Sequence, residues 1–586
     1  MDRRFLFALG IAALGIGFAG CNLAPPEMFD PAALQKNERY GAANSSSDYL
    51  RPLPTTREGA YGEREHGPSL MPAPDGPNRP TTGPDLDSDP VVRMSLREII
   101  HRAVANNHDV KVAGYQPAIE GTRVIEVEGN FDPVFFTTVQ YQHKDDVTGG
   151  QIFNSFGPNG GLITTDIDKQ DLGTLQTGIQ QNLDNGGQVQ LQYQNLYSWF
   201  SPQRTTLNPF YESDLTVQLT QPLLRNFGSD VSHARIVINR LNQKVSLLEF
   251  RKAVEQNATD IEKAYWNLVQ AQRDVQILSE LVARTESTYD ILNTRMRQKL
   301  DVSQLQVSQT QTRLESRRAQ LLQFKSQVRD FSDQIKGLMS DPEFPVTSSI
   351  VILPADAPVE EPMEFNLGDQ INTAMENRFE LGEQQLKVDA ADVTVTVAKN
   401  NLLPQLDFIG SVGAVGGAGN YGDAIKKNSD FNHFDYTVGF KLQIPLGNRA
   451  ARAIWKRTLL ERMAAIEQYR SHIETISVDV KTSARGVSTS WDTIVETRRA
   501  LYAAEDALGA INERERSGEP LTPEFVQLKL DIQEQLSQAL QAEAQAVAGY
   551  NIALAQLERS KGTLLRYNNV LLEEEMLKAE DNGLLH

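Results

Sequence analysis

The sequence has a single cysteine, Cys21, among 586 residues. One thiol cannot form a disulfide within the chain, so the fold must be held by packing alone. Positive charge is also scarce, because 57 Lys and Arg stand against 76 Asp and Glu, a net charge of −19. This balance argues against nucleic acid as a partner, since phosphate binding needs clustered Lys and Arg. The eight histidines are scattered without the spacing of zinc ligands, so we expect no metal and no cofactor.

Long apolar runs and catalytic groupings are missing as well. After the first 20 residues, no apolar run reaches the roughly 18 to 20 residues that a transmembrane helix needs. A further membrane crossing would therefore require a closed β-barrel, the other structure that satisfies its backbone groups in lipid. No Ser/His/Asp or Cys/His arrangement can be assembled, so we expect no enzyme. Gly417 to Gly422 fits G-x-G-x-x-G, but the residues after it predict a polar loop and not the helix that would hold a pyrophosphate.

The N-terminus carries targeting signals. Two arginines precede an apolar run in residues 1–20, which is typical of a signal peptide. The stretch from Phe18 to Cys21 resembles a bacterial lipobox, although leucine is usual where Phe18 stands. It predicts that Cys21 becomes the lipidated first residue of the mature chain; the alternative is cleavage nearby with a free thiol left behind. Asn22 suggests, by resemblance to bacterial lipoproteins, delivery to the outer membrane. Residues 21–90 are rich in Pro, Gly, Ser and charge, and predict a flexible periplasmic tether.

Several later segments alternate apolar and polar residues with period two, which is typical of strands with one apolar and one polar face. Val189, Leu191 and Tyr193, for example, alternate with glutamines. The tight turn "DNGG" at 184–187 joins two of these segments, and longer polar stretches predict loops between others. The loops are expected at 145–171, 198–212 and 416–432. The strands are expected at about 134–143, 174–183, 188–197, 213–221, 406–415 and 433–444.

Two long helices are predicted at about 232–297 and 450–515, with returning helices at about 303–339 and 523–565. Both long segments have an apolar seam of seven-residue period, as in coiled coils. The first seam contains Ile261, Leu268, Val275, Val282 and Tyr289. At 1.5 Å per residue each rod is roughly 97 Å long. Such rods cannot bury themselves in a globule, so they must stack lengthwise on each other or on other chains.

The order of elements recurs. A helix, alternating strands, a proline, a long helix and a returning helix occur twice, which predicts a two-fold internal repeat. Pro445 stands where Pro222 stood, and Trp491 where Trp266 stood. The predicted divisions are a signal peptide (1–20), a lipidated N-terminus and tether (21–90), repeat one (91–345), repeat two (346–570) and a charged tail (571–586).

This duplicated plan, "AKNNLLPQL" around Pro404, "KLQIPLGNRAARA" and the closing "GYNIALAQLERSKGTLL" resemble the TolC family of outer-membrane efflux and secretion channels over about residues 92–570. The resemblance implies an α+β membrane protein, a homotrimer whose chains share one transmembrane β-barrel that continues into a long periplasmic α-helical coiled-coil barrel. It also implies an outer-membrane duct of a tripartite efflux system, which receives small molecules from an inner-membrane pump and a periplasmic adaptor. A type I protein secretion duct is one alternative. A structural periplasmic coiled-coil lipoprotein is another, but it would leave the strands unexplained.

One departure concerns the number of strands. About 89 residues separate Pro133 from Pro222, against about 41 between Pro404 and Pro445, so repeat one carries an extra hairpin. Six strands per chain would close an 18-stranded barrel from three chains, where the family's usual count is four strands per chain. The competing interpretation keeps 12 membrane strands and lets the Gln-rich pair at 174–197 project outward as a separate hairpin.

The resemblance also suggests a gate. It places Asp531 at the constricted periplasmic end, where three copies would form an acidic ring that binds and selects cations. Arg514 or Arg516 would meet Asp301 there and hold the end shut. The alternative is that all four are solvated tip residues. The second tip, "SGEPLTPEF", is longer than expected for the family, so these contacts are the least transferable part of the resemblance.

Overall fold

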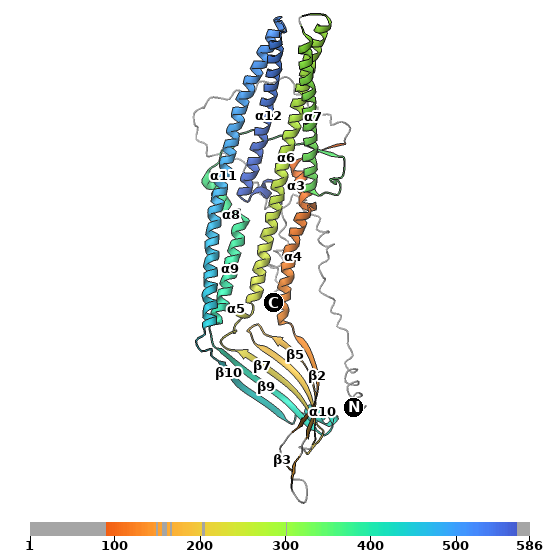
Figure 1. Cartoon of the computed structure of the whole chain (residues 1–586). Helices are drawn as coiled ribbons and strands as arrows, with labels where there is room; N and C mark the ends of the chain where they lie inside the picture. The colour runs from red at the N-terminus through yellow and green to blue at the C-terminus, as the bar shows by residue number, and fades with distance from the viewer. Residues whose placement is uncertain are drawn as a thin grey trace, which may run out of the picture.

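The chain forms one long, curved layer, with strands at one end and long helices extending from them (Figure 1). We call this curved layer the stave. The computed structural model describes residues 90–147, 151–154, 161–164, 167–201, 206–300 and 302–570. Within these ranges, no helix combines the length and apolarity needed to cross a membrane. The signal peptide, Cys21 with most of the tether, Asp301 and the charged tail lie outside the described residues.

The elements follow the order that the periodicity predicts, with several additions. The strands are β1 (Val91–Met94), β2 (Val134–Val147), β3 (Gln151–Asn154), β4 (Gly161–Thr164), β5 (Ile167–Asn182), β6 (Gln188–Ser201), β7 (Phe210–Pro222), β8 (Val351–Pro354), β9 (Gln405–Ala418) and β10 (Phe434–Gln443). The helices are α3 (Leu96–Asn106), α4 (His108–Glu128), η1 (Gly129–Phe131), α5 (Ser229–Ser232), α6 (Ala234–Arg297), α7 (Gln304–Met339), α8 (Leu367–Asn377), α9 (Phe379–Asn400), α10 (Tyr421–Ser429), α11 (Arg449–Arg516), α12 (Pro523–Ser560) and α13 (Leu564–Tyr567).

Six strands form one antiparallel sheet in the order β10-β9-β7-β6-β5-β2. All six strands predicted from the alternation are therefore present in a single sheet. The extra hairpin, β5 and β6, lies inside this sheet between β2 and β7 and pairs with both neighbours. It does not project from the sheet as a separate hairpin. Where one long polar loop was expected at 145–171, β2 and β5 extend into the segment and β3 pairs with β4.

The pairing register aligns one apolar face across the whole sheet. A single row crosses all six strands, and every residue in it is large, apolar and exposed. The row consists of Phe135, Ile179, Leu191, Val217, Val412 and Tyr436. Neighbouring residues in each strand point to the opposite face, where the adjacent row includes Gln192, Thr216 and Gly413. The sheet thus has one apolar and one mainly polar face, as the alternation predicts.

A short helix, α10, occupies the segment after the G-x-G-x-x-G pattern, so the prediction of a polar loop there was wrong. Asn420 caps this helix by accepting a hydrogen bond from the backbone N–H of Asp423. Ala424 and Asn428, four residues apart, are buried against the sheet. Asn428 donates to the carbonyl oxygen of Ala414, 3.1 Å away. The helix α10 therefore serves to pack against the sheet. Asp423 lies in its first turn, and this negative charge disfavours phosphate binding at the N-terminus of α10.

The first predicted helix is also divided in two. Asn107 ends α3, and its side chain accepts a hydrogen bond from the backbone N–H of Val110 in α4, 3.0 Å away. This local capping bond competes with continuous helix, as Asn side chains commonly do.

The helices form a curved layer that continues the sheet. Near the sheet, α4 packs on α6, α6 on α9 and α9 on α11; farther away, α7 packs on α6, α6 on α12 and α12 on α11. Since β2 follows α4 and β10 leads into α11, each long edge of the stave joins a strand to a helix. The largest apolar core lies around the middle of α6, where α3, α7, β8 and α13 pack on this helix.

Candidate functional site

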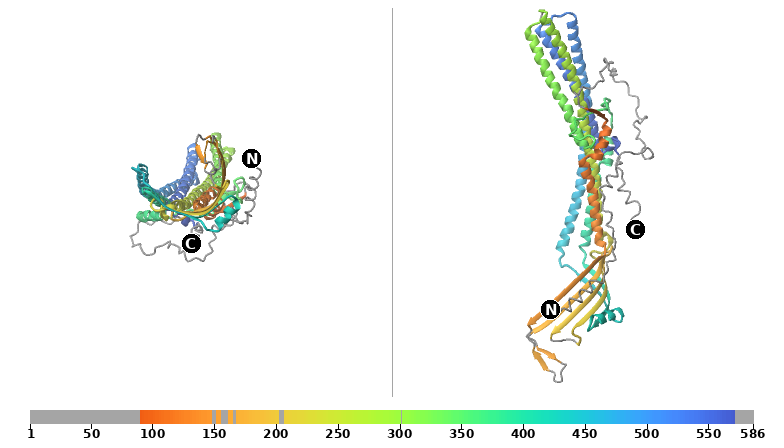
Figure 2. Two further views of the ribbon diagram at one scale, coloured as in Figure 1. Left: turned by 90° about the horizontal axis from the view of Figure 1, so that it is seen from below. Right: turned by 90° about the vertical axis from the view of Figure 1, so that its right-hand side faces the viewer.

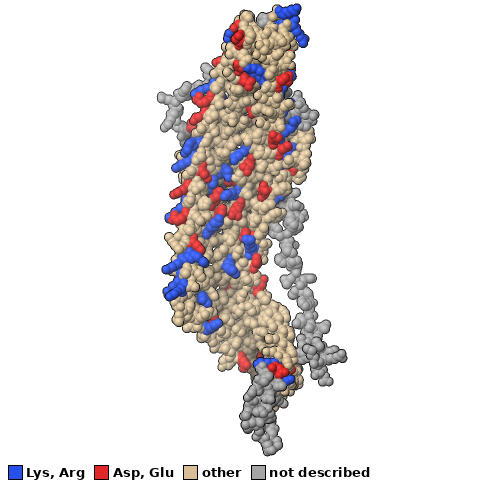
Figure 3. All heavy atoms as spheres, in the orientation of Figure 1, with Lys and Arg blue, Asp and Glu red and all other residues tan. Residues whose placement is uncertain are grey.

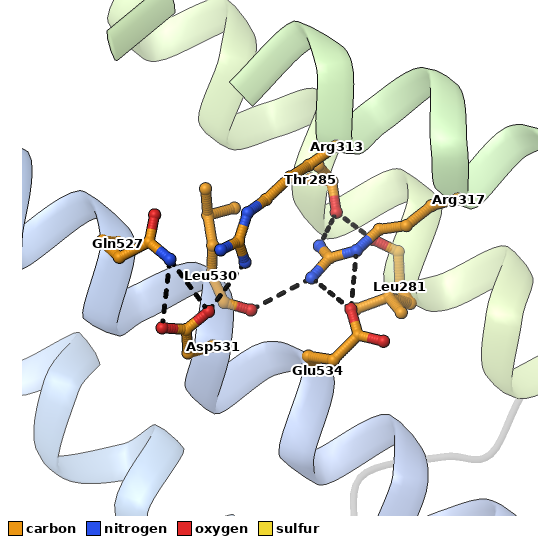
Figure 4. Close-up of polar contacts among 8 residues, drawn as sticks. All are labelled: Leu281, Thr285, Arg313, Arg317, Gln527, Leu530, Asp531 and Glu534. Atoms are coloured by element: carbon orange, nitrogen blue, oxygen red, sulfur yellow. Dashed lines mark hydrogen bonds and ion pairs between the residues drawn. The ribbon is translucent and has the colours of Figure 1, made fainter. Parts of the chain in front are cut away.

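The two long helical hairpins, α6–α7 and α11–α12, meet at the end of the stave farthest from the sheet (Figure 1). An apolar cluster joins their tips and includes Leu292, Val307, Ile511, Phe525 and Leu530. A group of polar side chains beside this cluster links α7 to α12 (Figure 4). We call this group the polar clamp; it consists of Thr285, Arg313, Arg317, Asp531 and Glu534.

Arg317 is the centre of the clamp. Its side chain is only 3% exposed, because it occupies a seam position of α7 in line with buried Thr310 and Leu314. The guanidinium donates through Nη2 to Glu534 Oε2 at 2.8 Å and through Nε to the same oxygen at 3.2 Å. Nη2 also donates to the backbone carbonyl of Leu530 at 3.0 Å, and Nη1 donates to Thr285 Oγ1. One side chain thus connects α6, α7 and α12.

Burial lowers the pKa of Arg317, and its hydrogen bond to Glu534 opposes that effect. An arginine keeps its proton at physiological pH even so, because its ordinary pKa is above about 12. The clamp therefore holds a buried positive charge whose acidic partner is Glu534. Removing one partner of such a pair is costly when the charge left behind stays buried, whereas replacing both partners with apolar groups often is not.

A second ion pair lies beside the first and is more exposed. Arg313 Nη1 donates to Asp531 Oδ1 at 2.8 Å, with side chains that are 31% and 45% exposed. Gln527 donates to both oxygens of the same carboxylate at 3.3 Å. Pairs of this exposure contribute little, about 0 to 1 kcal/mol. Arg313 and Asp531 thus help to orient α7 relative to α12, but they contribute little to the stability of the clamp.

The loops at the tips are tied together as well. The buried side chain of Gln306 donates to the backbone carbonyl of Leu521 in the second tip at 2.9 Å. Gln306 also forms a capping box with Ser303 at the start of α7. Lys529 of α12 bridges to Glu515 of α11 at 2.6 Å. The bond from Gln306 to Leu521 holds the α11–α12 turn against the α6–α7 turn, and the pair of Lys529 and Glu515 ties α12 to α11 within the second hairpin.

The predicted gate residues fall in different places. Asp531 lies in the clamp, but Arg514 pairs with Glu519 at 2.5 Å and Arg516 pairs with Glu513 at 2.6 Å. The structure does not test the predicted contacts with Asp301 or the acidic ring, so these stay predictions, as does lipidation of Cys21.

Sequence reasoning missed Arg313, Arg317 and Glu534. The signal that could have found Arg317 is its place in the α7 seam, where a charged residue interrupts a row that is otherwise suited to packing. In the described part of the chain, no cluster of three or more His, Cys, Asp or Glu residues has the geometry to hold a metal ion.

The sequence profile of the outer membrane efflux protein family matches residues 370–563, from α8 to the end of α12. This part of the chain is similar to the outer membrane efflux protein family. The resemblance to TolC-family channels that the sequence suggested is thereby confirmed. This family is one of channels and not an enzyme class. A search of curated protein sequences found no match.

Solved structures agree with the efflux-protein assignment at the level of the fold. The outer membrane protein VceC from Vibrio cholerae is 15% identical, with a TM-score of 0.55, over 80% of this chain and 96% of that one. The CmeC outer membrane channel of Campylobacter jejuni is 15% identical, with a TM-score of 0.56, over 83% and 88%. CusC, described with transmembrane channel formation, is 13% identical, with a TM-score of 0.57, over 80% and 92%.

Proposed function

We propose that this chain is the outer-membrane duct of a tripartite efflux system, a homotrimer that receives small molecules from a periplasmic adaptor and an inner-membrane pump. The observation that supports this most is the pair of open edges along the stave. Within the described residues, β2 and β10 are the end strands of the sheet, and α4 and α11 continue these two edges. A curved layer with two open edges has the form of a segment of a tube.

Further copies of the chain can close that tube. An edge strand exposes a row of backbone N–H and C=O groups, and placing β10 of one copy beside β2 of the next satisfies both rows. A head-to-tail contact of this kind closes into a ring when the rotation between copies fits. Three copies of six strands give 3 × 6 = 18 strands. Since barrel diameter grows roughly linearly with strand number, the bore would be about 1.5 times that of a 12-stranded barrel.

The apolar face of the sheet supports placement in lipid. Three residues of β10 show it most clearly, because Tyr436, Val438 and Phe440 are 79%, 67% and 68% exposed. An apolar row that crosses all six strands would be costly in water and is what the outside of a membrane barrel requires. The strands have 10 to 16 residues, enough for the 9 to 11 that a tilted membrane strand needs.

The helical part would then form the periplasmic tunnel, with the polar clamp at its far end. There the clamp would hold the α11–α12 hairpin of each copy against its own α6–α7 hairpin and keep the entrance narrow. Three Asp531 side chains would add an acidic ring, and Cys21 would anchor the tether in lipid. The second half of the chain repeats the order helix pair, strands, long helix and returning helix, which supports the two-fold repeat.

Channel recording tests the proposal directly. The purified full-length protein should migrate as a heat-modifiable oligomer and give stepwise currents in a planar lipid bilayer. A structural coiled-coil lipoprotein would give no current. If the protein inserts as a trimer but never conducts, the duct is refuted.

Cysteine labelling tests which strands face lipid. Ile179→Cys and Leu191→Cys on the apolar face should react with a lipid-soluble maleimide and resist a water-soluble one. Gln180→Cys and Gln192→Cys are matched controls, since they lie one residue away on the other face, and they should show the opposite preference. Ready labelling of all four sites from water would favour the 12-stranded barrel.

A further inference from the structure

The polar face of the β5–β6 hairpin is unusual in the half nearest its turn, because the polar groups there are neutral. On this face, β5 presents Thr174, Gln176, Gly178, Gln180 and Asn182, and β6 presents Gln188, Gln190, Gln192 and Gln194. These positions of the two described strands contain no Lys, Arg, Asp or Glu. The face of the stave drawn in Figure 3 shows the same contrast, with charged side chains spread over the helices and few over the sheet.

This amide-rich face lines the hollow of the sheet. The helix α10 packs on the opposite face, where a Cβ built on Gly416 would lie 2.3 Å from the carbonyl oxygen of Ala424. Figure 2 shows α10, in teal, outside the curve of the sheet. Because α10 covers the convex side, the glutamines of β5 and β6 face the concave side, which would be the lumen of the closed tube.

The glutamine amides are held in a fixed array. Gln190 Nε2 donates to Gln192 Oε1 at 2.9 Å, and Gln192 Nε2 donates to Gln194 Oε1 at 3.2 Å. An amide has two N–H donors and an oxygen with two lone pairs. Gln192 therefore keeps one N–H and one lone pair for a solute after both ladder bonds are made. The three side chains are only half-buried, so these groups are accessible.

An aromatic ring lies beside the array. The register places Phe136 of β2, Gly178 of β5 and Gln192 of β6 in one row. A Cβ built on Gly178 would come within 2.9 Å of the Phe136 ring, so the ring rests over the glycine. Any larger residue at 178 would displace it. The result is an aromatic platform next to oriented amides, and the acidic side chain nearest to the array in register is Asp214 of β7, opposite Gln194.

We infer that this hairpin binds uncharged, hydroxyl-rich solutes, and that its ligand is a linear neutral oligosaccharide. Sugar hydroxyls both donate and accept hydrogen bonds, which matches an array with free N–H groups and free lone pairs. The slightly positive C–H groups of a sugar ring suit the negative face of an aromatic ring. Residues two apart in a strand are roughly 6.7 Å apart, so the Gln190–Gln194 array is long enough for linked rings. This inference rests on the proposed duct and names a class of solute for it.

The test uses maltohexaose as the probe and the full-length oligomer. Maltohexaose is added to the compartment on the sheet side of the bilayer, opposite the helices. It should block the current reversibly, and a polyethylene glycol of similar size should not do so at the same concentration. Replacing the array with Gln190→Leu, Gln192→Leu and Gln194→Leu should raise the half-blocking concentration at least tenfold. Phe136→Leu should have a similar effect and serves if the triple variant does not assemble. Ser411→Val is the matched control, because Ser411 lies on the same face of β9, which is separated from β2 by the strands β5, β6 and β7, and it should leave the block unchanged.

Calorimetric titration of the detergent-solubilised protein with maltohexaose separates this inference from the duct. Binding that Phe136→Leu weakens supports the site even if no current is seen. A conducting pore that neither binds the sugar nor is blocked by it overturns the inference and leaves the duct standing. Equal block in the Phe136→Leu variant and in the wild type also overturns it.

Discussion

Replacing Glu534 with glutamine is expected to loosen the contact between the two hairpins, because it leaves the charge of Arg317 buried without its carboxylate. The variant keeps the shape of the side chain and a hydrogen-bonding oxygen, so the change is mainly one of charge. Removing one partner of a buried ion pair costs about 3 to 5 kcal/mol. Glu534 is 36% exposed, so water compensates part of this loss, and we expect a cost of about 3 kcal/mol.

The matched variant is Arg317→Met, which removes the buried charge and keeps an unbranched apolar side chain. The carboxylate left behind, Glu534, is 36% exposed and can be hydrated, so this change leaves no charge buried without compensation, unlike the removal of Glu534. We therefore expect a change within about 1 kcal/mol of the wild type, with Glu534→Gln adding little once Arg317 is methionine. The double-mutant cycle should then give a coupling energy of about 2 to 3 kcal/mol between the two side chains.

Amide hydrogen exchange measures the effect where it occurs. A cost of about 3 kcal/mol corresponds to a roughly 100-fold larger population of the opened state. Exchange of the α12 amides around Leu530 should therefore speed up about 100-fold in Glu534→Gln and stay within about fivefold of the wild type in Arg317→Met. Asp531→Asn, in the more exposed pair, should also stay within about fivefold. If Arg317→Met opens the hairpins as much as Glu534→Gln does, the uncompensated charge is not the cause and the reasoning fails.

Three further predictions concern other parts of the chain. Burial raises the pKa of Glu262 from 4.5 to about 7, although a hydrogen bond from Asn568 acts to lower it. Between these two pH values the folded state binds a proton that the unfolded state has lost. The free energy of unfolding therefore falls as the pH rises from about 4.5 to 7. Glu262→Gln should remove a pH dependence on the order of 3 kcal/mol, seen as parallel melting curves for wild type and variant below pH 4.5 and diverging curves above it. If three Asp531 carboxylates form the acidic ring, Asp531→Asn should lower cation selectivity and relieve block by multivalent cations, and an unchanged reversal potential would exclude the ring. Cys21→Ala should abolish acylation and leave channel currents intact, because the proposed barrel would itself hold the protein in lipid; an unmodified Cys21 in mass spectra of the mature wild-type protein would contradict lipidation.

The sequence alone determined the elements whose pattern is local. Alternation with period two predicted all six strands of the sheet, because a strand with one apolar and one polar face repeats every two residues. The seven-residue seams predicted α6 and α11, since a long helix packed along one side must repeat its apolar residues. Such patterns reflect the solvent on each side of an element, which neighbouring residues share. The nine residues of α10 are too short and too polar to show one, so that helix was predicted as a loop.

The tertiary structure decided what depends on partners far away in the sequence. Arg317 binds Glu534 across 217 residues, and nothing local to either side chain shows that α7 and α12 lie side by side. The register of β2 on β5 brings Phe136 onto Gly178, 42 positions along the chain; a shift of one residue would turn that ring to the other face. The open edges at β2 and β10 also exist only once the strand order is known. Periodicity specifies which face of an element is apolar, but not which element covers it, because many partners bury an apolar face equally well and only the packing of the whole chain selects among them.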